Sequence, residues 1–259
     1  GVCSPPGATK PPASVAHKLP AAGLGDPHGV VGENLGTEAE AIRYGSAAEL
    51  AGQSFAPLSV LLVENFDLPQ LRAPGFPDES FIRSEVPMTK QEVRAAALAK
   101  LAVMPTDTLW DVGAGTGSVS VELALAAPKG RVYAVECEPD ACELIRKNRA
   151  KFHACNLILI EGRAPDVLAD LPAPDAVFIG GTKGSMEAVL DEVLGKNPIA
   201  RICIWDIGLE RLCAAIAALT ARGLTAEVTQ IAVSRTKPAG RLHLLMANNP
   251  IFLITGTRK

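Results

Sequence analysis

Hydrophobic residues follow two patterns over the last two thirds of the chain. Short apolar runs alternate with longer stretches in which apolar residues recur at helical spacing, as in buried strands and amphipathic helices. The predicted strands are residues 108–112, 131–136, 156–161, 175–181, 200–205, 226–234 and 243–255. The predicted helices are residues 90–103, 118–127, 139–151, 185–194 and 208–222. Alternating strands and helices predict a parallel sheet, and the last two strands, joined by a polar loop at 235–241, predict an antiparallel pair.

The first third of the chain is less regular, because residues 1–80 hold half of the prolines. We expect short helices at 12–23 and 46–51, strands at 29–35 and 58–65, a polar stretch at 38–44 and a linker at 67–77. Ser46 is followed three residues later by Glu49, and Thr89 by Glu92. This is the capping-box spacing, so both are predicted to start helices.

The strand at 108–112 leads into a glycine-rich turn and then a helix. The turn carries Gly113, Gly115 and Gly117, which let the backbone turn tightly beside a ligand. In a doubly wound sheet, ligands lie at this end of the strands. The dinucleotide fingerprint requires a glycine where Ser118 stands. Asp111 would repel a pyrophosphate but attract the sulfonium and ammonium groups of S-adenosylmethionine (SAM). The alternative is a tight turn without a ligand.

Three further strand ends carry candidate ligand contacts. Glu136 follows the glycine turn by about 20 residues, at the strand end where an acid accepts both ribose hydroxyls of a nucleotide. The alternative is an ordinary acid at a strand end, with Glu138 as a rival. Arg163 and Ala164 would flank an adenine, unless 162–164 is a plain turn. The pair at 180–181 would face the substrate, unless it is a flexible turn.

Composition excludes several classes of function. The chain has 259 residues, of which 48% are hydrophobic and 20% charged, as in a soluble globular protein. Its net charge of −3 predicts neither a nucleic acid nor a membrane partner. No apolar run is long enough for a membrane span, so we expect a cytoplasmic protein. The six cysteines form no C-x-x-C pair, so we expect reduced thiols and no metal site.

Residues 76–255 carry several specific motifs. Those motifs are Pro77-Asp-Glu-Ser-Phe-Ile-Arg83, Val86-Pro-Met-Thr-Lys90, Trp110-Asp-Val-Gly-Ala-Gly-Thr-Gly117, Glu161-Gly-Arg-Ala-Pro165, Val177-Phe-Ile-Gly-Gly181 and Ile231-Ala-Val-Ser-Arg235. Together they resemble the decarboxylating precorrin C15-methyltransferases of cobalamin synthesis. The resemblance implies an α/β class I SAM-dependent methyltransferase fold, Rossmann-like, with a seven-stranded, mostly parallel sheet and an antiparallel last strand. It also implies a tetramer.

From the motifs and the resemblance together, ten residues are predicted to bind SAM. They are Thr89, Asp111, Gly113, Ala114, Gly115, Thr116, Gly117, Glu136, Arg163 and Ala164. The substrate is a tetrapyrrole with many carboxylates, so cations are expected around it. The predicted substrate-binding residues are Gly180, Gly181, Lys183, Arg235, Lys237 and Arg241. For the charged loop, the alternative is an ordinary solvated surface.

No catalytic side chain is assigned. In the resembling family C15 behaves as an enamine carbon that attacks the methyl group of SAM directly, so catalysis by positioning is expected. Loss of carbon dioxide from the C12 acetate then follows without a metal or flavin. The segment Trp205-Asp-Ile-Gly-Leu-Glu210 departs from the smaller residues usual in that family.

Residues 1–66 resemble a different protein family. Their motifs are Glu33-Asn-Leu-Gly36, Ile42-Arg-Tyr-Gly-Ser-Ala-Ala-Glu-Leu-Ala51 and Phe55-Ala-Pro-Leu-Ser-Val-Leu-Leu-Val-Glu-Asn65. They are similar to the C-terminal lobe of the tetrapyrrole methylases, particularly the precorrin C5-methylase. This implies the C-terminal part of a fused C5,15 enzyme, with residues 78–259 as the C15 domain. The lobe that carries the C5 cofactor loop is missing, so no C5 activity is expected.

Two other functions stay open at this point. One is a class I SAM methyltransferase that acts on RNA or protein, although a basic, aromatic-rich stripe for RNA is missing. The other is a non-enzymatic scaffold of the same fold that docks a partner methylase. The intact glycine turn and Glu136 argue against the scaffold.

Overall fold

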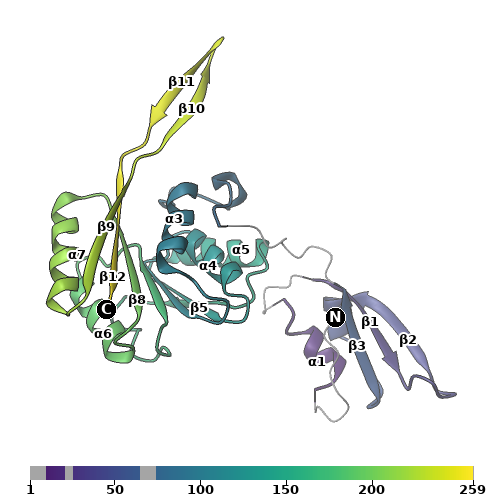
Figure 1. Ribbon diagram of the computed structural model, residues 1–259. Coiled ribbons are helices and arrows are strands. Elements are labelled where there is room, and N and C mark those ends of the chain that lie inside the picture. The colour runs from purple at the N-terminus through teal and green to yellow at the C-terminus, as the bar shows by residue number, and fades with distance from the viewer. Residues whose placement is uncertain (1–9, 21–25, 65–73, 259) are drawn as a thin grey trace. The chain divides into compact units, whose positions relative to one another are not determined.

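The computed structural model describes residues 10–20, 26–64 and 74–258. The chain forms two compact units (Figure 1). Unit 1 comprises residues 1–70 with 149–155, and unit 2 comprises 71–148 with 156–259. Part of the predicted linker, 67–73, and the end of the predicted first helix lie outside the described residues.

Unit 1 contains a three-stranded antiparallel sheet in the order β2-β1-β3. Its elements are α1 (Pro12–Ala16), β1 (His28–Glu33), β2 (Ala41–Ser46), α2 (Ala47–Ala51) and β3 (Ser59–Glu64). The capping box of Ser46 and Glu49 is present, as predicted. The prediction missed β2, because an edge strand with exposed side chains at Ile42 and Tyr44 lacks the alternation that marks a half-buried strand.

Unit 2 is built on a seven-stranded sheet in the order β6-β5-β4-β7-β8-β12-β9. Its strands are β4 (Thr108–Val112), β5 (Arg131–Glu136), β6 (Leu157–Glu161), β7 (Ala176–Ile179), β8 (Arg201–Asp206), β9 (Thr225–Ile231) and β12 (Ile251–Thr257). The first five strands of this order are parallel, and β12 runs antiparallel to both of its neighbours. The predicted class I methyltransferase fold is confirmed.

Helices cover both faces of this sheet (Figure 1). They are α3 (Gln91–Leu101), α4 (Ser118–Ala126), α5 (Pro139–Lys151), α6 (Met186–Lys196) and α7 (Leu209–Ala221), with a short 3-10 turn η1 (Asp78–Ser80) before them. The apolar positions of α6 and α7 pack with Trp110, Val177 and Ile204 in one buried cluster. The opposite face, against α3 and α4, carries the functional cavity. No helix in the described ranges is long and apolar enough to cross a membrane.

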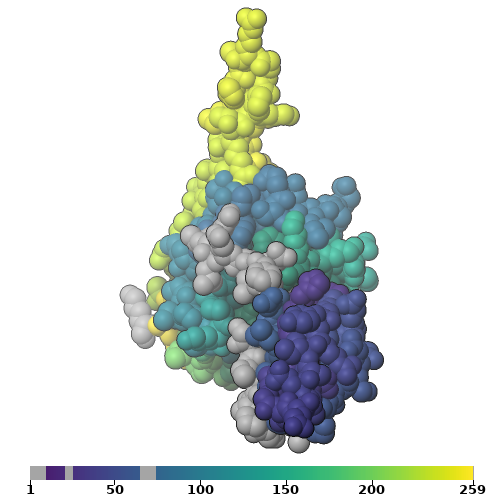
Figure 2. Space-filling model, turned by 90° about the vertical axis from the view of Figure 1, so that its right-hand side faces the viewer, coloured from purple at the N-terminus to yellow at the C-terminus, as the bar shows by residue number. Residues whose placement is uncertain are grey.

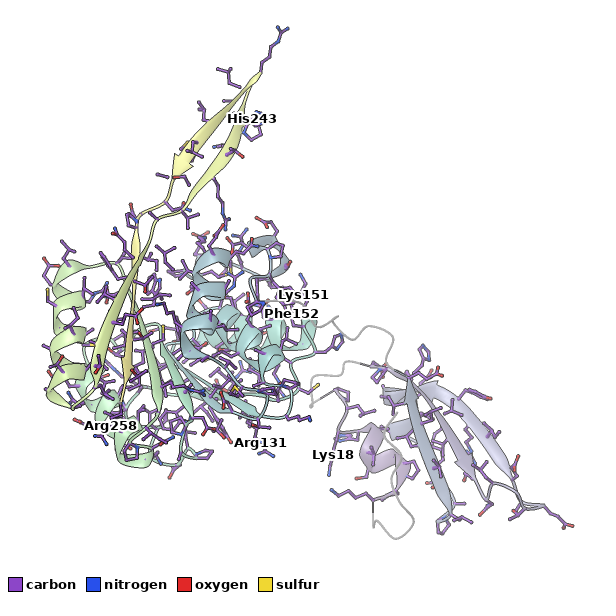
Figure 3. All side chains as sticks on the ribbon, in the orientation of Figure 1. Lys18, Arg131, Lys151, Phe152, His243 and Arg258 are labelled. Carbon is purple, nitrogen blue, oxygen red and sulfur yellow. The ribbon has the colours of Figure 1, made fainter. Side chains whose placement is uncertain are left out.

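The polar loop predicted at 235–241 is instead one strand and the turn of a β-hairpin, and the single strand predicted at 243–255 is divided between the hairpin and the sheet. Strands β10 (Ser234–Ala239) and β11 (Leu242–Ala247) pair antiparallel, and Gly240 at the turn has φ of 63°. The hairpin stands clear of the rest of unit 2 in both Figure 1 and Figure 2, and in Figure 3 His243 lies on it far from the sheet. Sequence periodicity could not reveal β10 or the break after β11, because neither face of the hairpin is buried.

A buried arginine on α3 joins the segments that surround the cavity. Arg94 is fully buried, and its guanidinium pairs with Asp78 at 2.9 Å and with Glu122 of α4 at 2.7 Å. It also donates to the carbonyls of Thr89 and Phe76. Glu122 in turn accepts backbone N–H groups from the chain entering the unit, at Gly75 and Phe76.

The same network reaches the root of the hairpin. Arg235 donates a hydrogen bond to Asp78 at 3.0 Å, and two of its nitrogens donate to the Glu92 carboxylate at 3.0 and 2.6 Å. Although burial opposes ionisation, the hydrogen bonds and charges of Arg94 and Arg235 hold the pKa of Asp78 below its ordinary value. Because Glu92 is engaged by Arg235, it does not close a capping box with Thr89; the helix begins at Gln91 after an N-cap at Lys90, so that predicted cap is wrong.

Replacing Arg94 by Met should lower the free energy of unfolding by about 3–5 kcal/mol, because it removes the buried cation between Asp78 and Glu122 and leaves Glu122 a buried charge without an ion-pair partner. The matched control is Lys147→Met, which removes an exposed i,i+4 pair with Glu143 and should cost at most about 0.5 kcal/mol. Urea unfolding followed by circular dichroism measures both. Equal losses in the two variants would contradict the central role of Arg94.

Candidate cofactor and substrate site

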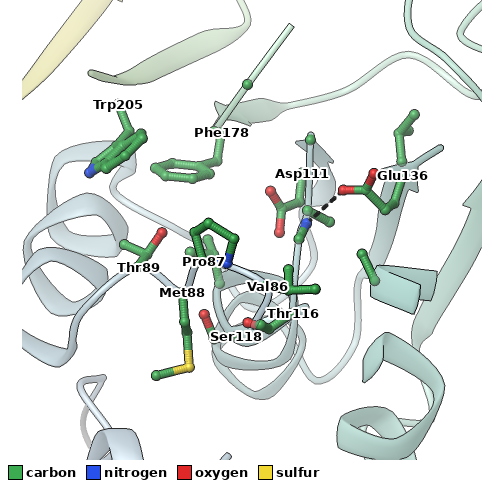
Figure 4. Close-up of a pocket in the computed structure, with 18 of the residues that line it drawn as sticks. Val86, Pro87, Met88, Thr89, Asp111, Thr116, Ser118, Glu136, Phe178 and Trp205 are labelled. Atoms are coloured by element: carbon green, nitrogen blue, oxygen red, sulfur yellow. Dashed lines mark hydrogen bonds between the residues drawn. The ribbon is translucent and has the colours of Figure 1, made fainter. Parts of the chain in front are cut away.

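A cavity of about 570 Å³ opens at the carboxyl ends of the central strands. Its walls come from the segment 86–90 before α3, the glycine turn after β4, the loops after β5, β6 and β7, and residues of β8 and β12. This is the size of a small-molecule site. Figure 4 shows Asp111, Glu136, Phe178 and Trp205 around it.

Strand register explains why these four side chains face one cavity. Asp111 of β4 is opposite Ala134 of β5 and Phe178 of β7, and Phe178 is opposite Cys203 of β8. Glu136 and Trp205 each stand two residues further along their strands, and side chains two residues apart share a face. The strand order β5-β4-β7-β8 therefore sets the sequence Glu136, Asp111, Phe178, Trp205 across the cavity.

Asp111 is buried and only partly satisfied. One carboxylate oxygen accepts a hydrogen bond from the Ser120 hydroxyl, whereas Oδ1 has no partner among the described residues. Burial raises the pKa of Asp111 to about 7, and the charge of Glu136 adds to this shift. A buried acceptor without a donor is costly, so a cationic N–H donor bound in the cavity fits this position. Thr116 Oγ1 also lacks a partner in the described structure.

Glu136 is held rigidly by backbone donors. Its Oε2 accepts from Gly115 N at 2.8 Å, and its Oε1 accepts from Cys137 N at 2.7 Å and Glu138 N at 3.0 Å. Oε2 accepts a single bond and therefore retains lone-pair capacity for a hydroxyl group. Its rival Glu138 is exposed and paired with Lys183, and that hydrogen bond holds the pKa of Glu138 below its usual range. Of the two acids, Glu136 is therefore the buried and fixed one in the cavity wall.

Two of the turn glycines are required for steric reasons. A Cβ on Gly113 would lie 2.3 Å from the carbonyl oxygen of Gly181, so the loops after β4 and β7 touch backbone to backbone. A Cβ on Gly117 would lie 2.9 Å from Ile145 of α5. Gly117 does not line the cavity, so it supports the turn from behind. The other nine predicted cofactor residues all line it.

The predicted substrate residues divide into two groups. Gly180, Gly181 and Lys183 line the cavity, but Lys183 sits at the Glu138 side, where Arg163 donates to its carbonyl at 3.5 Å. Arg235, Lys237 and Arg241 are absent from the lining: Arg235 belongs to the Arg94 network, and the other two lie on the exposed hairpin.

Sequence reasoning missed several residues at the far end of the cavity. Phe178, Trp205 and Ile251 supply apolar lining, and Lys90, Asn248 and Asn249 supply polar groups. Trp205 stood out in the sequence only as a departure from a family pattern. Strand register is the signal that places it beside Phe178, and register is not readable from one strand alone.

Comparison with known proteins agrees with this geometry. A family model described as a precorrin methyltransferase domain matches residues 80–258. The cobalt-precorrin-6B C(15)-methyltransferase (decarboxylating) of Salmonella typhimurium is 41% identical over 180 residues, which are 68% of this chain and 93% of the relative.

Two solved structures are also similar. A precorrin-6y C5,15-methyltransferase from Geobacter metallireducens has a TM-score of 0.69 at 37% identity and covers 72% of this chain and 100% of its own. The C-terminal domain of a precorrin-6Y C5,15-methyltransferase from Rhodobacter capsulatus has a TM-score of 0.63 at 36% identity, with coverages of 72% and 98%. This chain belongs to the family of precorrin methyltransferase domains.

Proposed function

We propose that this chain transfers a methyl group from SAM to C15 of precorrin-6B or cobalt-precorrin-6B and removes carbon dioxide from the C12 acetate, as a step of cobalamin biosynthesis. Family membership supplies the reaction class. The carrying structural observation is the pair of buried carboxylates, Asp111 and Glu136, on adjacent strands of one cavity. One fits an ammonium group and the other fits ribose hydroxyls.

The cavity residues act by holding the reactants. SAM, when bound, supplies an electrophilic methyl group. Glu136, fixed by three backbone donors, would orient the ribose, and Asp111 would hold the ammonium group. Ala164 and Arg163 would flank the adenine beside the loop after β6. The segment 86–90 lines the cavity and would help to hold the reacting carbon in line.

The binding of the acceptor would use the opposite end of the cavity. Lys90 is an exposed cation on the cavity margin and is suited to a substrate carboxylate. Gly180 and Gly181 leave space beside the methyl group. Arg235, which was predicted to contact substrate directly, would contribute by fixing the hairpin root, from which Asn248 and Asn249 enter the cavity.

Two partner proposals concern surfaces outside the cavity. Leu242, Leu244, Leu245 and Met246 are each at least 49% exposed on the hairpin. An isolated two-stranded ribbon is marginally stable, so we propose that the hairpin packs against further copies of this chain in a homo-oligomer, with the tetramer implied by family resemblance as the candidate.

The other surface is the open face of the unit 1 sheet. Ile42 and Tyr44 share that face with Val60 and Leu62, and all four are more than 40% exposed. We propose that this face contacts the cofactor-bearing lobe of a C5-methylase in a fused C5,15 enzyme, and that residues 1–66 alone have no C5 activity. A relative's description as the C-terminal domain of such an enzyme supports this arrangement.

Glu136→Gln should weaken SAM binding by about 1.5–3 kcal/mol, because hydrogen bonds from hydroxyls to a charged acceptor are lost. Calorimetric titration of the folded variant measures the change. Glu138→Gln is the matched control and should keep the wild-type affinity. If the two variants bind SAM equally well, Glu136 is not the ribose ligand.

SAM affinity should increase with pH through the range in which Asp111 ionises. In the free protein the pKa of Asp111 is about 7, and a bound ammonium group would lower it. Protonated Asp111 cannot pair with that group, so we expect about five- to tenfold weaker binding at about pH 6 than at about pH 7.2. Calorimetry with Asp111→Asn should show a flat profile. A slope that persists in this variant assigns the titration to another group.

Decarboxylation should depend on methyl transfer. Loss of carbon dioxide from an acetate leaves an electron pair that requires an acceptor, and the proposed reaction provides one only after C15 is alkylated and the ring nitrogens share a positive charge. Incubation of cobalt-precorrin-6B with S-adenosylhomocysteine should release no carbon dioxide. Incubation with SAM should release at most one molecule of carbon dioxide for each methyl group transferred. Mass spectrometry distinguishes the products; a decarboxylated, unmethylated product contradicts this order.

A further inference from the structure

The end of the cavity opposite Glu136 is an aromatic wall, defined here as Phe178 and Trp205. The two come from neighbouring strands and face the same side of the sheet. Phe178 is buried, but Trp205 is only half-buried and lines the cavity. The other tryptophan, Trp110, has no exposure and packs in the core on the opposite face. Trp205 is therefore not filling a core position.

The backbone below Trp205 is fixed by its neighbour. Asp206 accepts from Ile207 N at 2.6 Å and Gly208 N at 2.8 Å, and it pairs with Arg211 at 3.1 Å. The turn after β8 is thus held in one conformation that leaves Ile207 and Leu209 exposed. A rigid aromatic ring beside an apolar turn is suited to contact a flat ligand.

We infer that Trp205, backed by Phe178, is the stacking surface for the conjugated ring system of the methyl acceptor and determines its orientation. This rests on the proposed function. The order of side chains across the sheet carries the inference: both carboxylates that fit SAM lie on β4 and β5, so the acceptor must approach from the β7 and β8 side. There, the lining offers aromatic faces and not a further acid. If the macrocycle stacked on the face of Trp205, the carboxylates at the periphery of the macrocycle would be free to reach Lys90, Asn248 and Asn249.

Steady-state kinetics of the full chain with cobalt-precorrin-6B and SAM tests the inference. Trp205→Met should raise KM for the tetrapyrrole about five- to tenfold, since stacking is lost while a flexible apolar side chain fills the space. Trp205→Phe should restore most of the loss. Leu209→Ala, at the first residue of α7 and outside the cavity lining, is the matched control and should behave as wild type. The SAM dissociation constant should be unchanged in all three.

Oxidative footprinting of the wild-type protein provides a measurement that needs no variant. Hydroxyl-radical labelling of Trp205, read by mass spectrometry, should decrease when cobalt-precorrin-6B is added with S-adenosylhomocysteine, and not with S-adenosylhomocysteine alone. Tyr44, which is 75% exposed in unit 1, is the internal control for radical scavenging and should keep its labelling. Protection of Trp205 alone supports the inference.

The outcomes separate the two levels of the proposal. If the wild-type protein turns over the substrate and Trp205→Met has an unchanged KM for the tetrapyrrole, the stacking role is overturned and the proposed function stays intact. The same follows if KM rises equally in the Met and Phe variants. A reduced affinity of Trp205→Met for SAM would assign the aromatic wall to the cofactor, and this too overturns the stacking role. Absence of any turnover of either precorrin by the wild-type protein overturns the proposed function, and this inference with it.

Discussion

The structure of unit 2 depends on a buried guanidinium. Arg94 has no exposure to solvent, and desolvating a cation is costly unless charges and hydrogen bonds compensate it. Here two carboxylates and two carbonyls receive its donors. Those partners belong to three segments, which are the chain that enters the unit, the segment that precedes α3, and helix α4 itself. One side chain therefore fixes three segments relative to each other, and through Asp78 and Arg235 it also fixes the root of the hairpin.

This network explains why the cavity has a defined roof. The carbonyl of Thr89 is bonded to Arg94, so segment 86–90 is tied to the interior while its other residues face the cavity. Two buried acids of unit 2, Glu122 and Asp111, differ in how far their oxygens are hydrogen-bonded. Both oxygens of Glu122 accept hydrogen bonds, three in all, whereas Asp111 keeps one oxygen without a partner among the described residues. Glu122 lies outside the cavity lining, whereas the unmet acceptor of Asp111 belongs to a residue that lines the cavity and marks capacity for a ligand.

Sequence reasoning succeeded where chemistry and spacing are local. The glycine turn, Asp111 and Glu136 could be placed because a strand end determines where its residues lie. It could not identify partners that are distant in sequence: Arg235 pairs with residues 143 and 157 positions away, and its contact with substrate stays a prediction. The same pairing removed Glu92 from the capping box at Thr89. Strand β10 was missed because amphipathic periodicity requires a buried face.

Strand register determines which kind of side chain lies at each end of the cavity. A shift of one residue in any of the four central strands would turn Glu136, Asp111, Phe178 or Trp205 to the opposite face of the sheet. The alternation of side chains thus holds acids on β4 and β5 and aromatic rings on β7 and β8 in a single row. A cationic, hydroxyl-bearing ligand and a flat apolar ligand are then directed to opposite ends. In the proposed reaction the two ligands would meet between Asp111 and Phe178, which stand opposite each other in the sheet, and transfer by positioning would require no additional catalytic side chain.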